Sequence, residues 1–344
     1  VLLIRALMAG AIGLAGATVA AQAQEVGVME RPRPDYDAKG IPLGGFRAFP
    51  STEVDAISTD NLFQTSMAEL DDVGFEFAPV LRLTSEWRRH SLQILVGLKH
   101  FQYLDHSSED VTDWSVGANG RLDIVRGSAA SVNTTYSKAH EERSSPNSPG
   151  NIAKPVRYAV WHGDGTVAVQ PNRLGVSVAA QVDRFTYDAV PLVGGGVLSN
   201  EDRDRYQYRA SARLFYNFSP DLLGFVRAVY EDRRYDLDLD RTGVNRDSDG
   251  TAFEGGVEVN LAHLLRGEFF VGYLDHRFVA PLQDFSGLNY GATLTWYPTP
   301  LATISLSATR NLTATTVAGA SVSDDRSFEI GLDYEIRRNL IGQI

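Results

Sequence analysis

The stretch of residues 205–235, RYQYRASARLFYNFSPDLLGFVRAVYEDRRY, contains six arginines among tyrosines, leucines and phenylalanines. Even positions of 206–218 are apolar or aromatic, and odd positions of 205–217 are polar or charged, with Phe215 as the exception. Side chains of a β-strand alternate between two faces, so this pattern predicts a strand with one apolar and one charged face. The triplet SPD at 219–221 predicts a tight turn into a second such strand. Which face meets water is left open by this stretch alone.

The same alternation recurs along the chain and predicts an all-β fold of about fourteen strands. Examples are DWSVGANGRLDI at 113–124, AFEGGVEVNL at 252–261 and SFEIGLDYEIR at 327–337. Most of these strands exceed the roughly 9–11 residues with which a tilted strand crosses a bilayer. The predicted strands are 46–58, 73–86, 90–104, 111–125, 129–143, 156–170, 173–187, 204–218, 222–235, 250–262, 266–278, 286–297, 301–313 and 325–337. Pro50 and Pro79 are discordant, since proline removes a ladder hydrogen bond.

The connections alternate between short and long. Tight connections lie at 87–90, 126–128, 171–172, 219–221, 263–267 and 298–300, and longer ones at 59–72, 105–110, 143–154, 188–204, 236–249, 279–286 and 312–325. Outer-membrane barrels have short periplasmic turns and long external loops, whereas a Greek-key sandwich would not keep this asymmetry. We therefore expect an antiparallel up-and-down transmembrane β-barrel whose charged strand faces line a water-filled lumen.

Aromatic residues near the strand ends of the apolar face fit a membrane-interface girdle, although cross-strand aromatic pairing is an alternative. They are Tyr206, Phe218, Trp114, Trp296, Phe269 and Tyr273. On the opposite face we expect a pore lining of alternating sign, which gives a transverse field and ion pairs that stiffen the wall. The expected pore-lining residues are Asp113, Arg121, Asp123, Arg209, Arg213, Arg227, Glu254, Glu258, Glu329, Asp333, Glu335 and Arg337.

Two segments precede the predicted barrel of 46–344. Residues 1–24, with Arg5, an apolar run and AQA at 21–23, indicate a secretory signal peptide, and a buried N-terminal helix is the alternative. Residues 25–45 are rich in proline, glycine and charge, which predicts an extended periplasmic segment. We expect export and localisation in the outer membrane. There is no cysteine, so a disulfide or a thiolate metal site is excluded.

Motifs for catalysis or cofactor binding are not found, and we expect neither an enzyme, a cofactor nor a metal centre. The seven histidines lack the HExxH spacing, and no GxSxG motif exists. NRDSDG at 245–250 partly matches a calcium loop, but position 256 is Gly where the loop requires Glu. With DLDLD at 236–240 it forms an acidic loop, for which a solvated loop and weak divalent-cation binding both stay open. The net charge of −11 argues against nucleic acid as a partner.

The chain resembles the Putative beta-barrel porin 2 family of outer-membrane proteins, best known from alphaproteobacteria. The resemblance rests on stretches such as RPRPDYDAKGIPLGGFRAFPSTEV (31–54), NEDRDRYQYRASARLFYNFSP (200–220) and EFFVGYLDHRF (268–278), and it runs from about residue 31 to the end. It implies an outer-membrane barrel, and an association with exopolysaccharide export. The chain departs from the family at YEIRRNLIGQI (334–344), where a turn at 337–339 opens another strand. We interpret this as a C-terminal truncation.

The leading hypothesis is a channel for passive diffusion of small hydrophilic solutes, with a mild cation preference from the acidic excess and with 188–204 as the loop that constricts the pore. The alternative is a channel or accessory of exopolysaccharide secretion, for which Phe101, Tyr103 and Phe215 could stack sugars. The expected partners are outer-membrane lipid and lipopolysaccharide, the barrel-assembly machinery and, for the alternative, polysaccharide-export components. An enzyme would need a compact dyad, and a soluble β-sandwich or propeller lectin would run as a monomer without detergent.

Overall fold

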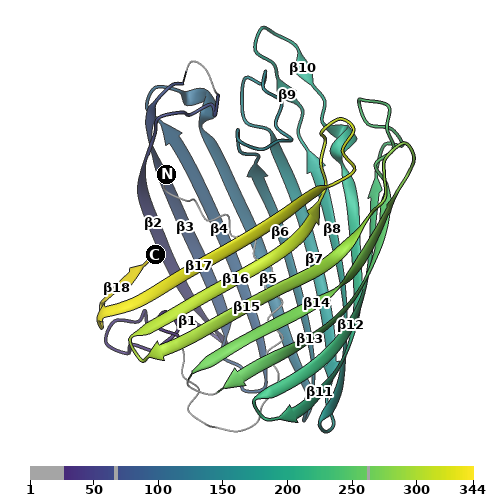
Figure 1. Cartoon of the computed structure of the whole chain (residues 1–344). Helices are drawn as coiled ribbons and strands as arrows, with labels where there is room; N and C mark the ends of the chain where they lie inside the picture. Colours follow the sequence, from purple (N-terminus) through teal and green to yellow (C-terminus); the bar gives the residue numbers. More distant parts are fainter. Residues whose placement is uncertain (1–26, 66–68, 262–263) are drawn as a thin grey trace.

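One antiparallel sheet of 16 strands, in chain order, makes up most of the molecule (Figure 1). The computed structural model describes residues 27–65, 69–261 and 264–344. The predicted signal peptide at 1–24 therefore lies outside the described residues. The strands of the sheet are β1 (Ile41–Leu43), β2 (Phe46–Thr59), β3 (Asp72–Ser85), β4 (His90–Tyr103), β5 (Val111–Val125), β6 (Ser128–His140), β7 (Arg157–Val169), β8 (Leu174–Tyr187), β11 (Arg205–Ser219), β12 (Leu222–Tyr235), β13 (Ser248–Leu261), β14 (Leu265–Phe278), β15 (Phe285–Thr299), β16 (Ala302–Thr313), β17 (Ser323–Arg337) and β18 (Leu340–Gln343).

The predicted all-β fold and its alternating strands are confirmed. Each long strand from β2 to β17 begins and ends within three residues of its predicted bounds. The opening stretch forms the β11–β12 hairpin, in which Arg213 pairs with Arg227 across the ladder. The turn expected after Arg337 leads into β18, which pairs with β17. Among the described residues, β18 is the further strand expected after that turn, and the structure adds β1 at the other edge and β9 (Val190–Pro191) with β10 (Val197–Leu198) in a long loop.

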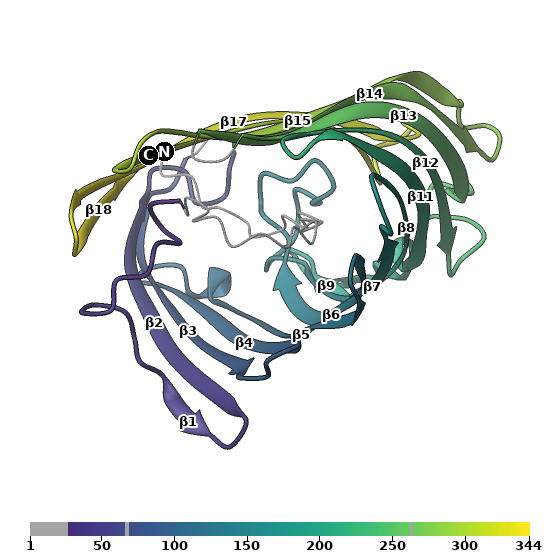
Figure 2. The ribbon, with the colours of Figure 1, turned by 90° about the horizontal axis from the view of Figure 1, so that it is seen from below.

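The sheet curls around an open interior, as seen from the turn end in Figure 2. One end of the long strand β2 comes near the last strand, β18, at one side of the molecule, whereas β1 points away. Among the described residues, however, no ladder joins β1 or β2 to β17 or β18, so the hydrogen-bonded sheet has two edges. The architecture is that of an up-and-down barrel wall whose ends are not joined by backbone pairing.

The segment before β1 lies against the far edge of the sheet. Val28 is only 1% exposed, and its backbone N–H donates to Thr303 Oγ1 of β16 at 2.9 Å. Arg33 forms an ion pair of 2.9 Å with Glu335 of β17. Residues 28–30 form a turn, and the polar contacts with β16 and β17 hold this part of the segment against the sheet. The chain then crosses to β1, so this segment links the two edges of the sheet.

Short turns and long loops alternate as expected, with the turns at one end and the loops at the other (Figure 1). The β5–β6 turn needs a glycine at position 127. Gly127 has φ +76°, in the left-handed region, and a Cβ there would lie 2.1 Å from the carbonyl oxygen of Gln170. The Gln170 N–H donates to the Gly127 carbonyl, so neighbouring turns are hydrogen bonded at this end.

Both discordant prolines lie inside strands. Pro50 of β2 pairs with Leu81, and Pro79 of β3 pairs with Thr52. On its other side, β3 lacks two residue pairs with β4. The β3–β4 ladder passes from Phe77 directly to Val80, and the register is the same before and after this gap. Proline has no N–H to donate, so the sheet accepts a local gap there without a bulge.

Helical structure in the described part of the chain consists of two single 3₁₀ turns, η1 (Ser107–Glu109) and η2 (Glu201–Arg203). No helix among these residues has both the length and the apolar character that crossing a membrane requires.

Candidate functional site: the concave wall and the loop cluster

The sheet has an apolar convex face and a polar concave face. On β12 and β13 the apolar side chains are strongly exposed, with Val226 at 58% and Phe253 at 69%. Two charged residues of the opposite face, Arg213 of β11 and Glu254 of β13, are almost fully buried, each at 5%. Side chains spread apart on the convex side of a curled sheet and crowd together on the concave side. The charged face is therefore the concave one, and water belongs inside the curl.

The aromatic residues expected at a membrane interface lie on the exposed convex face. Tyr206, Phe218, Trp114, Trp296, Phe269 and Tyr273 are 38–59% exposed. Some of them also pair with each other or with neighbours, since Trp114 and Tyr136 have ring centroids 5.4 Å apart. A belt at the strand ends and cross-strand pairing thus occur together on this face.

Four of the expected pore-lining residues meet in one cluster on β11–β14. Arg213, Arg227, Glu254 and Glu258, together with Phe225 and Glu268, form what we call the wall cluster. Arg213 forms ion pairs with Glu258 at 3.2 Å and Glu268 at 2.9 Å, and its guanidinium lies 3.8 Å from the centroid of the Phe225 ring. Such stacking suits the planar guanidinium and leaves its edge free for carboxylates.

Glu254 is the most enclosed charge of the wall cluster, with 1% of its side chain exposed. One carboxylate oxygen accepts from Nε of Arg227, and the other accepts from Nδ2 of Asn289 at 2.6 Å. Arg227 also lies 3.6 Å from Glu268. Both oxygens of the buried carboxylate are therefore satisfied, which is the condition for tolerating a buried charge.

The other expected pore-lining residues are dispersed over the concave wall. Arg209 pairs with Glu231 at 2.7 Å, Arg121 with Asp123 at 3.0 Å, Asp113 with His140 at 2.8 Å, and Glu335 with Arg33. Asp333 accepts from Gln343 at 3.0 Å. Glu329 and Arg337 are exposed on β17, and neither has an ion pair within the described ranges. That these residues line a pore stays a prediction.

Long loops from opposite walls meet above the interior. We call this the loop cluster, formed by residues 141–156, 188–204, 236–247 and 314–322. The side chain of Asn147, after β6, accepts from the N–H of Thr316, after β16, at 2.8 Å. Strands β6 and β16 lie on opposite sides of the curl (Figure 2), so this contact spans the opening. The segment 188–204, expected to constrict the pore, packs on 141–156 through buried Ile152, Val156 and Val190.

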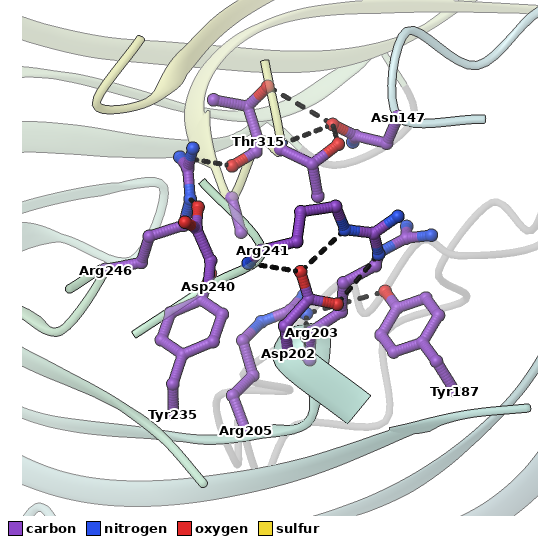
Figure 3. A pocket seen from close by; sticks show the side chains of 12 residues that line it. Asn147, Tyr187, Asp202, Arg203, Arg205, Tyr235, Asp240, Arg241, Arg246 and Thr315 are labelled. Carbon is purple, nitrogen blue, oxygen red and sulfur yellow. Dashed lines mark hydrogen bonds and ion pairs between the residues drawn. The ribbon is translucent and has the colours of Figure 1, made fainter. Parts of the chain in front are cut away.

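Arginines hold the loop cluster together (Figure 3). Arg203 forms two hydrogen bonds with the carboxylate of Glu141, at 3.0 and 2.7 Å, and Arg241 likewise forms two with Asp202, both 2.7 Å. Arg246, 6% exposed, pairs with Asp240 and donates to the carbonyl of Thr315 at 2.8 Å. It also donates to the carbonyls of Val317 and Ala320. One arginine thus ties the 236–247 loop to the 314–322 loop.

Two carboxylates of the loop cluster, those of Asp202 and Asp240, are stabilised in their charged form. Burial acts to raise the pKa of Asp240, but hydrogen bonds from Thr242, Arg246 and Val244 outweigh it and lower that pKa to about 2. The pKa of Asp202 is also lowered, because hydrogen bonds from Arg241 outweigh its burial. At neutral pH both residues are ionised and available to their arginines.

Carboxylates of the acidic loop 236–250 bind groups of the protein itself, within the loop and beyond it, as Asp236 does with Arg184 of β8. Asp240 binds Arg246 and Thr242, and Asp247 accepts from the N–H of Tyr235 at 2.8 Å. No group of three or more histidine, aspartate or glutamate residues in the described part of the chain could hold a metal ion. The calcium-like motif at 245–250 lies within a loop that arginines bind.

Sequence reasoning missed several residues of this region. Glu268 follows the alternation of β14 and could have been assigned to the charged face. The sequence contains no periodic pattern that points to Arg203, Arg241 and Arg246. These residues lie in loops, where the tertiary fold decides which carboxylate each arginine binds.

Comparison with known proteins gives a family and distant structural matches. The model of the family described as Putative beta-barrel porin 2 matches residues 33–344. A search of curated proteins found no match. Among solved structures, the P. putida toluene transporter TodX matches with 11% identity over 85% of this chain and 88% of that chain, at a TM-score of 0.32. The siderophore receptor PiuA from Acinetobacter baumannii matches with 10% identity over 87% of this chain and 63% of that chain, at a TM-score of 0.35.

Proposed function

The chain belongs to the Putative beta-barrel porin 2 family of outer-membrane channel proteins, and we propose that it lets small hydrophilic solutes cross by passive diffusion with a mild preference for cations. The observation that supports this most is the division of faces. Apolar side chains are exposed outside the curl, and charged, hydrogen-bonded side chains line its inside. A polypeptide wall of this kind separates lipid from an aqueous path.

The proposed cation preference rests on the distribution of charge over the concave wall. Basic residues gather on β11 and β12, whereas β17 presents Asp325, Glu329, Asp333 and Glu335 on the concave side. The whole chain has a net charge of −11. Charged rings of one sign favour counter-ions in a pore, and opposite signs on facing walls orient polar solutes between them.

The loop cluster is the proposed constriction. Its loops are tied by bidentate arginine pairs, which are stronger and more directional than single ion pairs. Solutes would therefore pass between fixed polar groups, not through an open mouth. This geometry favours small hydrophilic molecules over large ones.

Reconstitution of the full chain into planar lipid bilayers tests the proposal. We expect stepwise conductance, and a reversal potential in a KCl gradient that shows K⁺ to be modestly more permeant than Cl⁻. A folded, inserted protein with no conductance would refute the channel, and a Cl⁻-selective reversal potential would refute the cation preference.

Exopolysaccharide secretion stays the second hypothesis. Of the aromatic residues expected to serve it, Phe101 is 7% exposed and covered within the wall. The four tryptophans, including Trp114 and Trp161, are all exposed residues away from the concave wall. Tyr103 and Phe215 are half-buried, and Phe225 and Phe270 lie on the charged face beside Arg213 and Arg227, so the aromatic content of the wall does not separate small solutes from sugar polymers. Deletion of the gene followed by measurement of secreted polysaccharide separates the two functions.

A further inference from the structure

Three consecutive turns at the turn end of the sheet carry four arginines. They are the turns between β3 and β4, between β5 and β6, and between β7 and β8, at 86–89, 126–127 and 170–173. Hydrogen bonds link them in a row, since Nη2 of Arg89 donates to the Ile124 carbonyl at 2.7 Å and the Gln170 N–H donates to the Gly127 carbonyl at 2.6 Å. We call these three turns the turn sector. Its arginines are Arg88, Arg89, Arg126 and Arg173.

The positive charge of the turn sector is not balanced by carboxylates. All four arginines are exposed, and none of them has an ion pair within the described part of the chain. The nearest carboxylates along the chain bind other arginines, since Glu86 pairs with Arg47 at 2.7 Å and Asp123 with Arg121 at 3.0 Å. In a chain with a net charge of −11, the turn sector is therefore a local region of positive potential. The arginines of the long loops differ, because each holds a carboxylate: Arg143, Arg203, Arg241 and Arg246.

The turn sector borders the apolar convex face. Trp87, Val125 and Leu174 are 49%, 62% and 47% exposed, and each is adjacent in the sequence to an arginine of the turn sector. Leu122 and Ile124 continue the exposed apolar surface along β5. An arginine here can lay its aliphatic stem on apolar surface and extend its guanidinium beyond the rim. In a barrel whose convex face meets acyl chains, this is the level of the lipid headgroups.

We propose that the turn sector binds the phosphate groups of anionic phospholipids in the leaflet at the turn end. Arginine forms paired N–H hydrogen bonds with phosphate oxygens, and basic residues beside a membrane attract anionic headgroups. Exposed apolar residues alternate with the arginines along the rim, which matches lipids that combine a phosphate with acyl chains better than it matches an acidic protein surface. This contact lies on the outer rim, so it goes beyond the proposed function and does not depend on a path for solutes.

The test measures which phospholipid lies next to Trp87. In a reporter chain, Trp114, Trp161 and Trp296 are replaced by phenylalanine, so that all tryptophan fluorescence comes from the turn sector. The reporter chain is reconstituted into vesicles of phosphatidylcholine and phosphatidylglycerol, in which one of the two lipids carries brominated acyl chains that quench tryptophan on contact. We expect phosphatidylglycerol to be favoured at Trp87 by about fivefold. In about 1 M salt, which screens exposed charges, this preference should disappear.

A matched pair of triple variants removes the same number of positive charges from either end of the barrel. Arg88→Gln, Arg126→Gln and Arg173→Gln together should reduce the preference for phosphatidylglycerol to less than about twofold. Arg89 is kept, because its hydrogen bond with the Ile124 carbonyl links two turns. The control changes exposed arginines near the loop end and should leave the preference unchanged: Arg234→Gln, Arg277→Gln and Arg326→Gln.

The outcomes decide between lipid and other anions. Absence of a preference in the reporter chain at low salt, or the same preference after loss of the three turn arginines, overturns the proposal. Polyglutamate on both sides of the vesicle should not displace phosphatidylglycerol; displacement would instead make the turn sector a docking site for an acidic protein. If the triple variant does not fold, the salt dependence of the reporter chain decides, and a preference that persists in about 1 M salt counts against the arginines. An arginine-dependent preference in a barrel without conductance keeps the lipid site and overturns the channel.

Discussion

Replacement of Glu254 by glutamine tests whether the wall cluster stabilises the barrel. The carboxylate is 1% exposed, and it accepts from Arg227 on one oxygen and from Asn289 on the other. Glutamine has nearly the same shape but carries one carbonyl oxygen and no charge. The variant therefore keeps the packing, but its amide oxygen can accept from only one of the two donors, and its NH2 group faces the other. Arg227 keeps Glu268, at 3.6 Å.

The expected magnitude follows from these contacts. Hydrogen bonds to charged groups contribute about 1.5–3 kcal/mol each, against about 1 kcal/mol for neutral ones. One charge-assisted bond becomes a neutral one and the other is lost, while Glu268 compensates in part, so we expect the free energy of unfolding to fall by about 3 kcal/mol. Adding Arg227→Met should recover part of the loss, because removing both members of a buried pair costs less than removing one.

Urea unfolding from lipid vesicles measures this loss, with the fluorescence of the four tryptophans as the signal. Glu329→Gln is the matched control, because Glu329 is exposed on the concave side of β17 and has no ion pair among the described residues. We expect the control to change the free energy of unfolding by less than about 0.5 kcal/mol. If Glu254→Gln is equally mild, the wall cluster does not stabilise the barrel and this reasoning is wrong.

Three further predictions concern the loops and the two faces. Arg246→Met should raise the single-channel conductance, because it removes the carbonyl contacts that hold the 314–322 loop, whereas Arg277→Met should not. The Asp240 carboxyl has its pKa lowered to about 2 in the folded state, so its stabilisation of the loop cluster is complete above about pH 4 and disappears as the pH falls toward 2. Conductance should therefore rise over that window in the parent protein, and the rise should be smaller in Asp240→Asn. Val226→Arg on the convex face should lower the free energy of unfolding in vesicles by about 2–4 kcal/mol. Ser307→Arg on the concave face, opposite Glu329, should be tolerated, and equal costs at the two positions would contradict the assignment of the faces.

Much of the arrangement of side chains on the sheet could be predicted from the order of residues along each strand. A strand has a period of two, so the apolar positions of β11 and the charged positions of β5 and β13 could be separated from the sequence alone. The register then brought Arg213, Arg227 and Glu254 into neighbouring ladder positions, as alternation along a hairpin requires. Pro79 has no N–H to donate, and the β3–β4 ladder has a gap at this residue, as expected.

By itself the sequence determined the all-β fold, the strand bounds, the alternation of turns and loops and the division into an apolar and a charged face. These features depend on periodicity and on residues close together in the chain. Only the tertiary structure decided which loops meet across the interior, that Arg246 ties two of them, and that, among the described residues, the turn arginines Arg88, Arg126 and Arg173 are left without a carboxylate. Residues such as Asn147 and Thr316 are 169 positions apart. Contacts at that separation depend on the curl of the whole sheet, and no local pattern of side chains encodes them.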